Sequence, residues 1–169
     1  MLDLVVVGGG TAGLAAAAYA ASEGLHTLLV GRQRCRADMP GADALPGFPG
    51  TVTGLCDGGL LRRAEDQSRR FGSHVLPGRV ASGFDGSSYP YRVGLDDGQV
   101  VQARSLIVAT GMRQDGAADP AAQANTAWLD GYLDTDDWGY IHTGRAAAGS
   151  MQARAFDCLL YTSPSPRDS

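Results

Sequence analysis

The chain has no lysine, little cysteine and no long apolar run, and each shortage excludes a class of protein. Its 14 basic residues are all arginine and its formal net charge is −4, so no basic patch indicates nucleic-acid binding. Every apolar run is shorter than the ~20 residues of a membrane span. The start, MLDLVVVGGG, lacks the basic region and cleavage site of a signal peptide. We therefore expect a globular protein of the cytoplasm without a membrane partner.

The side chains that commonly bind metals or form disulfides are few and scattered. Cys35, Cys56 and Cys158 form no CxxC motif, and three separated cysteines do not make a disulfide framework. None of the three histidines has a ligand partner at metal spacing. The sequence thus predicts no metal site, and it singles out no side chain as a catalytic acid, base or nucleophile.

The first 31 residues predict a βαβ unit. A Val-rich run over Leu2–Val7 indicates a buried parallel strand, the Ala-rich stretch Leu14–Ser22 indicates a helix, and His26–Val30 indicates a second buried strand. Such a unit belongs to an α/β fold with a parallel sheet. We expect helices on both sides of that sheet.

Downstream, the pattern predicts an antiparallel addition to the sheet. The stretch Asp57–Phe71 reads as an amphipathic helix, and the DDG sequence of Asp96–Gly98 indicates a hairpin. The predicted strands are His74–Leu76, then an antiparallel meander of Arg79–Phe84, Tyr89–Leu95 and Gln99–Ala103, then a separate buried strand, Leu106–Ala109. Weaker patterns indicate a short helix at Ala127–Leu133 and a short strand at Tyr140–Thr143.

The turn after the first strand carries glycines at Gly8, Gly10 and Gly13, in G-x-G-x-x-G spacing. The first glycine permits the tight turn, the second lets a pyrophosphate approach the backbone, and the third lets helix and strand pack closely. Free N–H groups and the helix dipole then favour phosphate. Because the motif follows a strand and opens a helix, it indicates dinucleotide binding. A glycine-rich turn without a ligand is the alternative.

Four segments together resemble the FAD domain of thioredoxin reductase-like flavoproteins, within the pyridine-nucleotide disulfide oxidoreductases. They are DLVVVGGGTAGLAAAAYAASEGLHTLLV, LPGFPG, RRFGSHVLPGRV and YRVGLDDGQVVQARSLIVATG. The resemblance implies a Rossmann-like FAD-binding domain, a small-molecule dinucleotide as partner, and allows a homodimer. By position it assigns the pyrophosphate to Gly8, Gly10, Thr11, Ala12 and Gly13, the adenine to the backbone of Val80, and the flavin to Thr110 and Gly111.

A second match, NTAWLDGYLDTDDWGYIHTGR, resembles the segment with which this family returns to its FAD domain after an NAD(P)H domain. Here a short join stands where that domain is expected, so the NAD(P)H site is absent from the chain. The predicted organisation is residues 1–113 as the first part of the FAD-binding domain, 114–124 as the join, 125–157 as the return segment, and 158–169 as a tail.

The tail, CLLYTSPSPRDS, matches the translation of a DNA adapter used in shotgun sequencing. A real Pro/Ser-rich tail is the alternative. We expect this segment to be non-native and poorly packed, and the chain to be a fragment.

The family pattern is altered at two places that contact the cofactor. The acidic residue expected at the end of the second strand, which bonds the ribose hydroxyls, is replaced by Gly31, followed by Arg32. An arginine suits a 2′-phosphate, so NADP in place of FAD is an alternative, as is a solvated Arg32. In the flavin loop, Cys35 and Ala44 fall where the family has Gln and Asn.

Two functions follow from the resemblance and these departures. The first is a fragment of an FAD-dependent oxidoreductase, in whose intact form NAD(P)H transfers hydride to the flavin. The alternative is a non-catalytic dinucleotide-binding module. As it stands, we expect the chain to be inactive.

Overall fold

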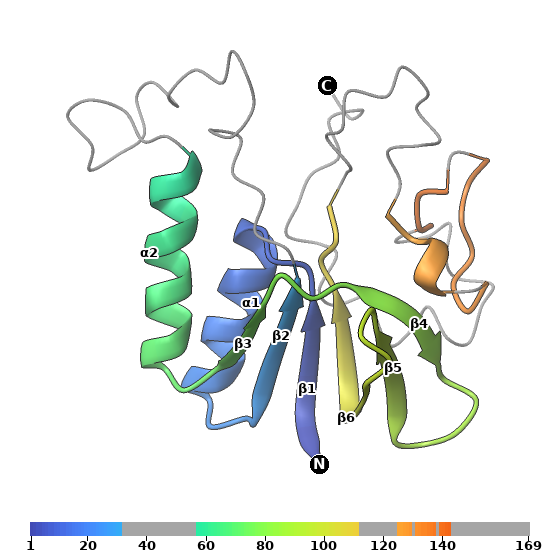
Figure 1. Cartoon of the computed structure of the whole chain (residues 1–169), viewed down its shortest axis with the longest axis horizontal. Coiled ribbons are helices and arrows are strands. Elements are labelled where there is room, and N and C mark those ends of the chain that lie inside the picture. Colours follow the sequence, from blue (N-terminus) through green and yellow to red (C-terminus); the bar gives the residue numbers. More distant parts are fainter. Residues whose placement is uncertain (32–56, 112–124, 130, 138, 143–169) are drawn as a thin grey trace.

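The computed structural model describes residues 1–31, 57–111, 125–129, 131–137 and 139–142 (Figure 1). The predicted βαβ start is confirmed, and the chain then adds a helix and four strands. In chain order the elements are β1 (Leu2–Val7), α1 (Thr11–Ser22), β2 (Thr27–Gly31), α2 (Asp57–Arg70), β3 (His74–Pro77), β4 (Ala81–Asp85), β5 (Tyr91–Leu95), β6 (Val100–Val108) and the 3₁₀ helix η3 (Ala127–Leu129).

The strands form one six-stranded mixed sheet in the order β3-β2-β1-β6-β5-β4. Strands β3, β2 and β1 run parallel, and β1 also pairs in parallel with β6. Strands β4, β5 and β6 form the antiparallel meander. The predicted fold class, a Rossmann-like parallel sheet with a three-stranded antiparallel meander, is therefore confirmed.

Strand β6 is longer than the sequence predicts. The predicted strands Gln99–Ala103 and Leu106–Ala109 are one continuous strand, Val100–Val108. Its first half pairs antiparallel with β5, from Val100 opposite Gly94 to Ala103 opposite Tyr91. Its second half pairs in parallel with β1 and ends with Val108 opposite Val7. The polar residues Arg104 and Ser105 suggested a break, but both are exposed strand residues.

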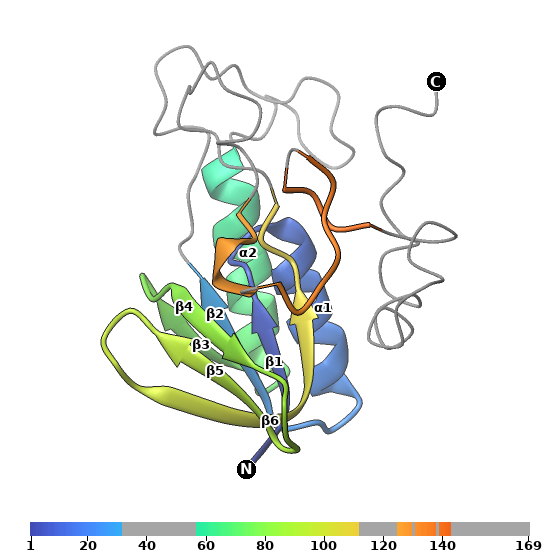
Figure 2. The ribbon, with the colours of Figure 1, turned by 90° about the vertical axis from the view of Figure 1, so that its right-hand side faces the viewer.

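The expectation of helices on both sides of the sheet holds only in reduced form: the second face has just the short 3₁₀ helix η3 among the described residues, and both α-helices lie on the first. Both helices cover the same face, and they pack against each other (Figure 2). Their core contains Leu14 and Ala17 of α1, Leu61 of α2, and Leu4 and Val6 of β1.

The meander covers the opposite face of the parallel strands. Val5 and Val7 of β1 point that way, because side chains alternate along a strand. They pack in a second core that also contains residues of β2, the meander and the return segment: Leu28, Val30, Ala81, Val93, Leu95, Ala103, Leu106, Trp128, Leu129 and Leu133. A strand layer and the return segment thus take the place of the expected second helix layer.

The weaker predictions hold in reduced form. Within Ala127–Leu133, the helix is the single 3₁₀ turn of η3. Near Tyr140–Thr143, the described residues form one isolated bridge, between Thr135 and Ile141. No helix in the part of the chain that the structure describes is long and apolar enough to cross a membrane.

Candidate dinucleotide-binding site

The turn between β1 and α1 is held by close backbone contacts that require glycine. The Gly8 N–H donates to the Val30 carbonyl of β2 at 2.8 Å. Gly8 has a φ of 131°, and a Cβ atom there would lie 2.0 Å from the Ala109 carbonyl oxygen. Only glycine adopts this conformation readily and leaves room for the two residues that follow β6, Ala109 and Thr110. Gly8 therefore joins the ends of three neighbouring strands.

Gly13 and Gly10 have opposite surroundings. A Cβ atom on Gly13 would lie 1.9 Å from the Gly8 carbonyl oxygen, so Gly13 lets α1 rest on the turn. A Cβ atom on Gly10 would meet nothing within 4 Å, and Gly10 is exposed. Packing within the protein thus explains Gly8 and Gly13, whereas Gly10 keeps a space outside the backbone free.

The amino terminus of α1 presents N–H groups to that space. Gly10 is the N-cap and gives no side-chain cap, and the first turn has no acidic residue. Thr11 and Ala12 follow it and are exposed. The first N–H groups of a helix have no partner within the helix, and its dipole favours an anion there. A diphosphate matches both properties.

Gly31, at the end of β2, packs directly on the glycine turn. A Cβ atom there would lie 2.2 Å from the Gly9 nitrogen and 2.8 Å from the Gly8 carbonyl carbon. An acidic side chain at position 31 therefore requires the turn to shift. In this chain Gly31 contacts the turn through its backbone, and it has no side chain that could bond a ribose hydroxyl.

Thr110 and Gly111 follow β6 on the side of the turn opposite β2. The preceding Ala109 donates its N–H to the Val7 carbonyl at 2.7 Å, and the Thr110 nitrogen lies 2.9 Å from the ideal Cβ position of Gly8. Gly111 is exposed, with a φ of 60°. The structure therefore brings these two residues together with the glycine turn at the carboxyl ends of β1 and β6.

Val80 lies on a different connection, between β3 and β4. Its carbonyl accepts a hydrogen bond from the Asp96 N–H at 3.0 Å, and its side chain is half-buried. The last residue of β3, Pro77, pairs with Gly31, so the connection that carries Val80 starts beside the end of β2. The other altered positions, Arg32, Cys35 and Ala44, lie outside the described residues.

The sequence analysis did not single out Gly9 and Ala109, which form the walls of the turn. Gly9 is buried against Gly31, and Ala109 packs against Gly8 and Gly13. Their small size could have indicated this role, because Gly9 lies within GGG of the motif and Ala109 lies in VATG at the end of β6. Among the described residues, no group of three or more His, Cys, Asp or Glu side chains lies together as metal ligands do.

The charged groups with shifted pKa values lie away from this turn. A hydrogen bond from the His26 N–H, together with the Arg104 guanidinium, lowers the pKa of the Asp3 carboxyl. Hydrogen bonds from Ser87 lower the pKa of Asp85. The hydrogen bonds and the ion pair that cause these shifts stabilise local structure at the start of β1 and the end of β4. The groups that the described part of the turn presents are therefore the backbone N–H groups at the start of α1.

These features define a class: a Rossmann-like domain whose parallel sheet carries an antiparallel meander, with an anion-accepting turn where β1 lies between β2 and β6. Ligands of open α/β sheets bind at such a point, beyond the carboxyl ends of the strands. Comparison with known proteins narrows the class. The family described as FAD dependent oxidoreductase matches residues 3–36.

The chain has the fold of the FAD-binding domain of thioredoxin reductase-like flavoproteins and resembles them in sequence. It is 30% identical to a thioredoxin reductase of Aquifex aeolicus over 64% of this chain and 33% of that protein. It is 29% identical to one of Peptoclostridium acidaminophilum over 80% of this chain and 42% of that protein. The solved thioredoxin reductase of Gloeobacter violaceus has a TM-score of 0.58 and 28% identity, over 71% of this chain and 40% of that one. The chain thus spans well under half the length of these relatives.

Proposed function

We propose that the turn from Gly8 to Gly13 holds the pyrophosphate of FAD, and that the chain is part of an FAD-dependent NAD(P)H oxidoreductase. The observation that carries the proposal is the contrast between the glycines: Gly8 and Gly13 are closed by backbone contacts, and Gly10 opens onto free space. Packing within the turn does not require glycine at position 10, so we attribute this glycine to a ligand that lies close to the backbone.

The chain's own residues then bind and orient the cofactor. The N–H groups at Gly10, Thr11 and Ala12 donate to the phosphate oxygens, and Gly13 keeps α1 aimed at them. Val80 meets the adenine through its backbone, and Thr110 and Gly111 lie behind the flavin. When bound, FAD accepts hydride from NAD(P)H and passes the electrons on. No described side chain needs to act as an acid or base.

The test is Gly10→Ala. Gly10 has ordinary angles for any residue, with φ −81° and ψ −178°, so the substitution should leave the fold intact. The methyl group projects into the space assigned to the pyrophosphate, and we expect the FAD dissociation constant to rise at least tenfold. Flavin fluorescence titration measures it.

The matched control is Gly83→Ala in β4, where a Cβ atom also meets nothing within 4 Å. Its affinity for FAD should equal that of the unaltered chain. Unchanged FAD affinity in Gly10→Ala, with an intact fold, contradicts the proposal.

One observation favours the second candidate, a dinucleotide-binding module without redox activity. Gly31 leaves no room for the carboxylate that bonds the ribose in the family, so one source of cofactor affinity is missing. This candidate predicts that ADP and FAD bind about equally, because the flavin half then adds no contact. Tighter binding of FAD than of ADP favours the oxidoreductase.

A further inference from the structure

The Asp96–Gly98 hairpin between β5 and β6 contacts the connection that carries Val80. The Leu95 N–H donates to Gln99 at 2.8 Å and the Gly98 N–H donates back to Leu95 at 3.0 Å. Gly98 has a φ of 82°, which matches a three-residue hairpin loop that ends with a left-handed glycine. The hairpin is thus a fixed turn, able to hold a neighbouring segment.

Two contacts join this hairpin to the segment before β4. The Asp96 N–H donates to the Val80 carbonyl at 3.0 Å. The Arg79 guanidinium forms an ion pair with Asp97 at 3.0 Å and a longer one with Asp96 at 3.8 Å. The position of the Val80 backbone is therefore fixed by the hydrogen bond to its carbonyl and by the ion pair of the preceding residue, Arg79.

The Asp97 carboxylate is itself fixed from two sides. One oxygen, Oδ1, accepts the Gln99 N–H at 3.0 Å, and the other, Oδ2, faces Arg79. Its side chain is 17% exposed, against 44% for Arg79. Because the acid is the more shielded partner and is also bound by the Gln99 N–H, we expect it to determine where the arginine and the adjoining backbone lie.

We propose that Asp97 is a positioning residue for the adenine end of the dinucleotide, acting through Arg79 on the backbone of Val80. The inference rests on the proposed function, which gives Val80 its contact with the adenine. Asp97 does not touch the ligand. It removes freedom from the Val80 backbone before binding, and a site ordered in advance loses less entropy when the ligand arrives.

The test is Asp97→Asn, in which the amide oxygen still accepts the Gln99 N–H while the ion pair with Arg79 is lost. Asp3→Asn is the matched control. It removes the Asp3–Arg104 ion pair of 3.3 Å at the start of β1 and retains an oxygen for the His26 N–H. Each variant changes the net charge equally, and each breaks one carboxylate–arginine pair.

The probes are ADP and inorganic pyrophosphate, measured by calorimetry. We expect Asp97→Asn to raise the ADP dissociation constant about threefold to fivefold, the range of a partly exposed ion pair, and to leave pyrophosphate affinity unchanged. Asp3→Asn should alter neither. The ADP difference should shrink in high salt, which screens the pair.

The outcomes separate the two proposals. If the unaltered chain binds ADP and Asp97→Asn binds it equally well, the positioning role is wrong. A parallel loss of ADP and pyrophosphate affinity, with a fall in melting temperature beyond that of Asp3→Asn, shows a general loosening and also overturns it. Failure of the unaltered chain to bind either ADP or FAD contradicts the proposed function itself, and this inference with it.

Discussion

Single glycine residues determine whether the ends of β2 and β6 can pack against the glycine turn. Gly8 combines a left-handed φ with a contact to Ala109 that leaves no room for a methyl group, and Gly31 meets the turn from the other side. A Cβ atom at either position must push backbone, which cannot rotate away as a flexible side chain can. The turn and the two strand ends beside it therefore form one tightly packed unit.

We predict that Gly8→Ala and Gly31→Ala each lower the free energy of unfolding by about 2 kcal/mol or more. Overpacking alone costs about 1–3 kcal/mol, and a non-glycine residue in a strained φ region adds about 1–3 kcal/mol at position 8. Urea unfolding measures the loss. Gly10→Ala is the comparison and should stay within about 0.5 kcal/mol of the unaltered chain. Equal stability of all three variants means that the turn is more adaptable than its contacts indicate.

At the start of β1, Asp3 predicts a pH dependence. Its pKa is lowered in the folded protein by the His26 N–H and by Arg104. A carboxyl with a depressed pKa stabilises the fold above its unfolded pKa, near 3.9, and the stabilisation is lost as the pH falls through the folded value. We expect Asp3→Asn to unfold at lower urea than the unaltered chain at pH 7, and the two midpoints to converge as the pH falls through the folded pKa of Asp3. A constant difference across this pH range excludes this origin.

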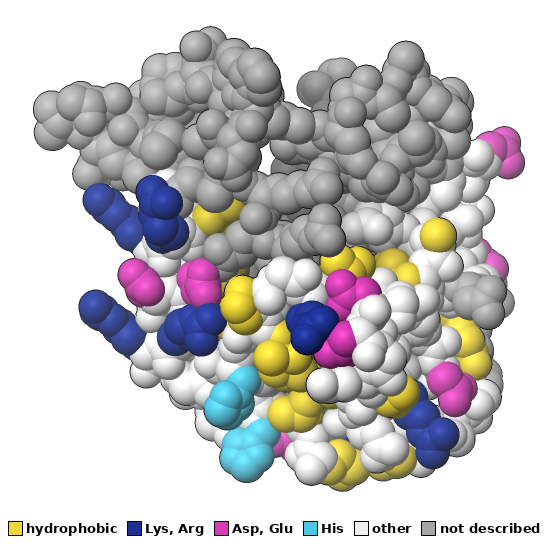
Figure 3. Space-filling view, in the orientation of Figure 1, with side chains coloured by type: hydrophobic (Ala, Val, Ile, Leu, Met, Phe, Trp, Pro, Cys, Tyr) yellow, Lys and Arg dark blue, Asp and Glu magenta, His cyan; other side chains and the backbone are white. Residues whose placement is uncertain are grey.

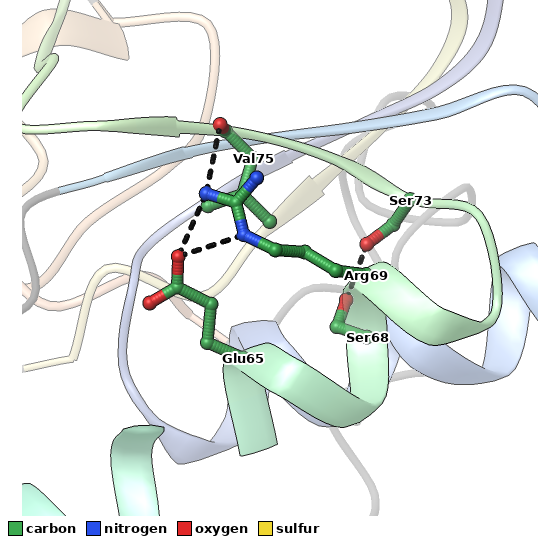
Figure 4. Close-up of polar contacts among 5 residues, drawn as sticks. All are labelled: Glu65, Ser68, Arg69, Ser73 and Val75. Atoms are coloured by element: carbon green, nitrogen blue, oxygen red, sulfur yellow. Dashed lines mark hydrogen bonds and ion pairs between the residues drawn. The ribbon is translucent and has the colours of Figure 1, made fainter. Parts of the chain in front are cut away.

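At the scale of elements, a small polar cluster fixes α2 to β3 (Figure 4). The buried hydroxyls of Ser68 and Ser73 lie 2.5 Å apart. Arg69 donates to Glu65 on the same helix and, at 3.4 Å, to the Val75 carbonyl of β3. Four further charged side chains of α2, Arg62, Arg63, Asp66 and Arg70, are exposed, and basic and acidic groups lie close together over this helix (Figure 3). The cluster thus fixes the end of α2 against β3, directly after the turn at Gly72, which has a φ of 97°.

We predict that Ser68→Ala costs about 1–3 kcal/mol, since it leaves the buried Ser73 hydroxyl without its partner. The double variant Ser68→Ala/Ser73→Ala removes both polar groups and should recover part of the loss. Chemical denaturation of the two single variants and the double variant gives the coupling. Strictly additive losses indicate that each hydroxyl has another partner.

A second cluster fastens the return segment to the meander. The ring of Phe84 packs edge-on against Trp128 and Tyr132, at centroid distances of 6.5 and 5.1 Å. The Tyr132 hydroxyl donates to Asp85 at 3.3 Å. Residues after the join thereby rest on β4 and add Trp128, Leu129 and Leu133 to the core of the sheet.

The elements that local patterns determine were predictable from sequence. The Val-rich run predicted β1, the Ala-rich stretch predicted α1, and the alternating pattern predicted β5, each with boundaries within a few residues. The DDG sequence predicted the hairpin between β5 and β6. The glycine turn was also predictable, because its spacing reflects backbone geometry. The continuity of β6 was not, since Arg104 and Ser105 look like a break until their partners Asp3 and Tyr89 are known.

The side of the sheet that each layer covers was also beyond the sequence. Apart from Asp3, β1 is apolar on both faces, so nothing in Leu4–Val7 shows which face receives helices. The role of Gly31 is another example: as a missing carboxylate it is visible in the sequence, but its contact with Gly9 depends on how β2 meets the turn.

At the scale of the whole molecule, we predict that the chain binds FAD weakly and does not oxidise NADPH. Residue 31 provides no carboxylate for the ribose, and a charge-assisted hydrogen bond of that kind contributes about 1.5–3 kcal/mol. The turn and the helix terminus remain, so we expect adenine nucleotides to bind in the micromolar to millimolar range. Fluorescence titration with FAD, followed by anaerobic addition of NADPH, measures both. Stoichiometric FAD binding with bleaching by NADPH contradicts the prediction.

The pairing of β1 with β6 has a consequence for synthesis on the ribosome. Leu2 pairs with Ala103 and Val7 pairs with Val108, so β1 gains its second neighbouring strand only when a segment much later in the chain has been made. Contacts so distant along the chain slow folding. Until then, one edge of β1 stays open while α1 and β2 are already in place. Until β6 is made, the nascent chain therefore exposes an unpaired, Val-rich strand edge, the kind of surface that chaperones shield and that other chains can capture.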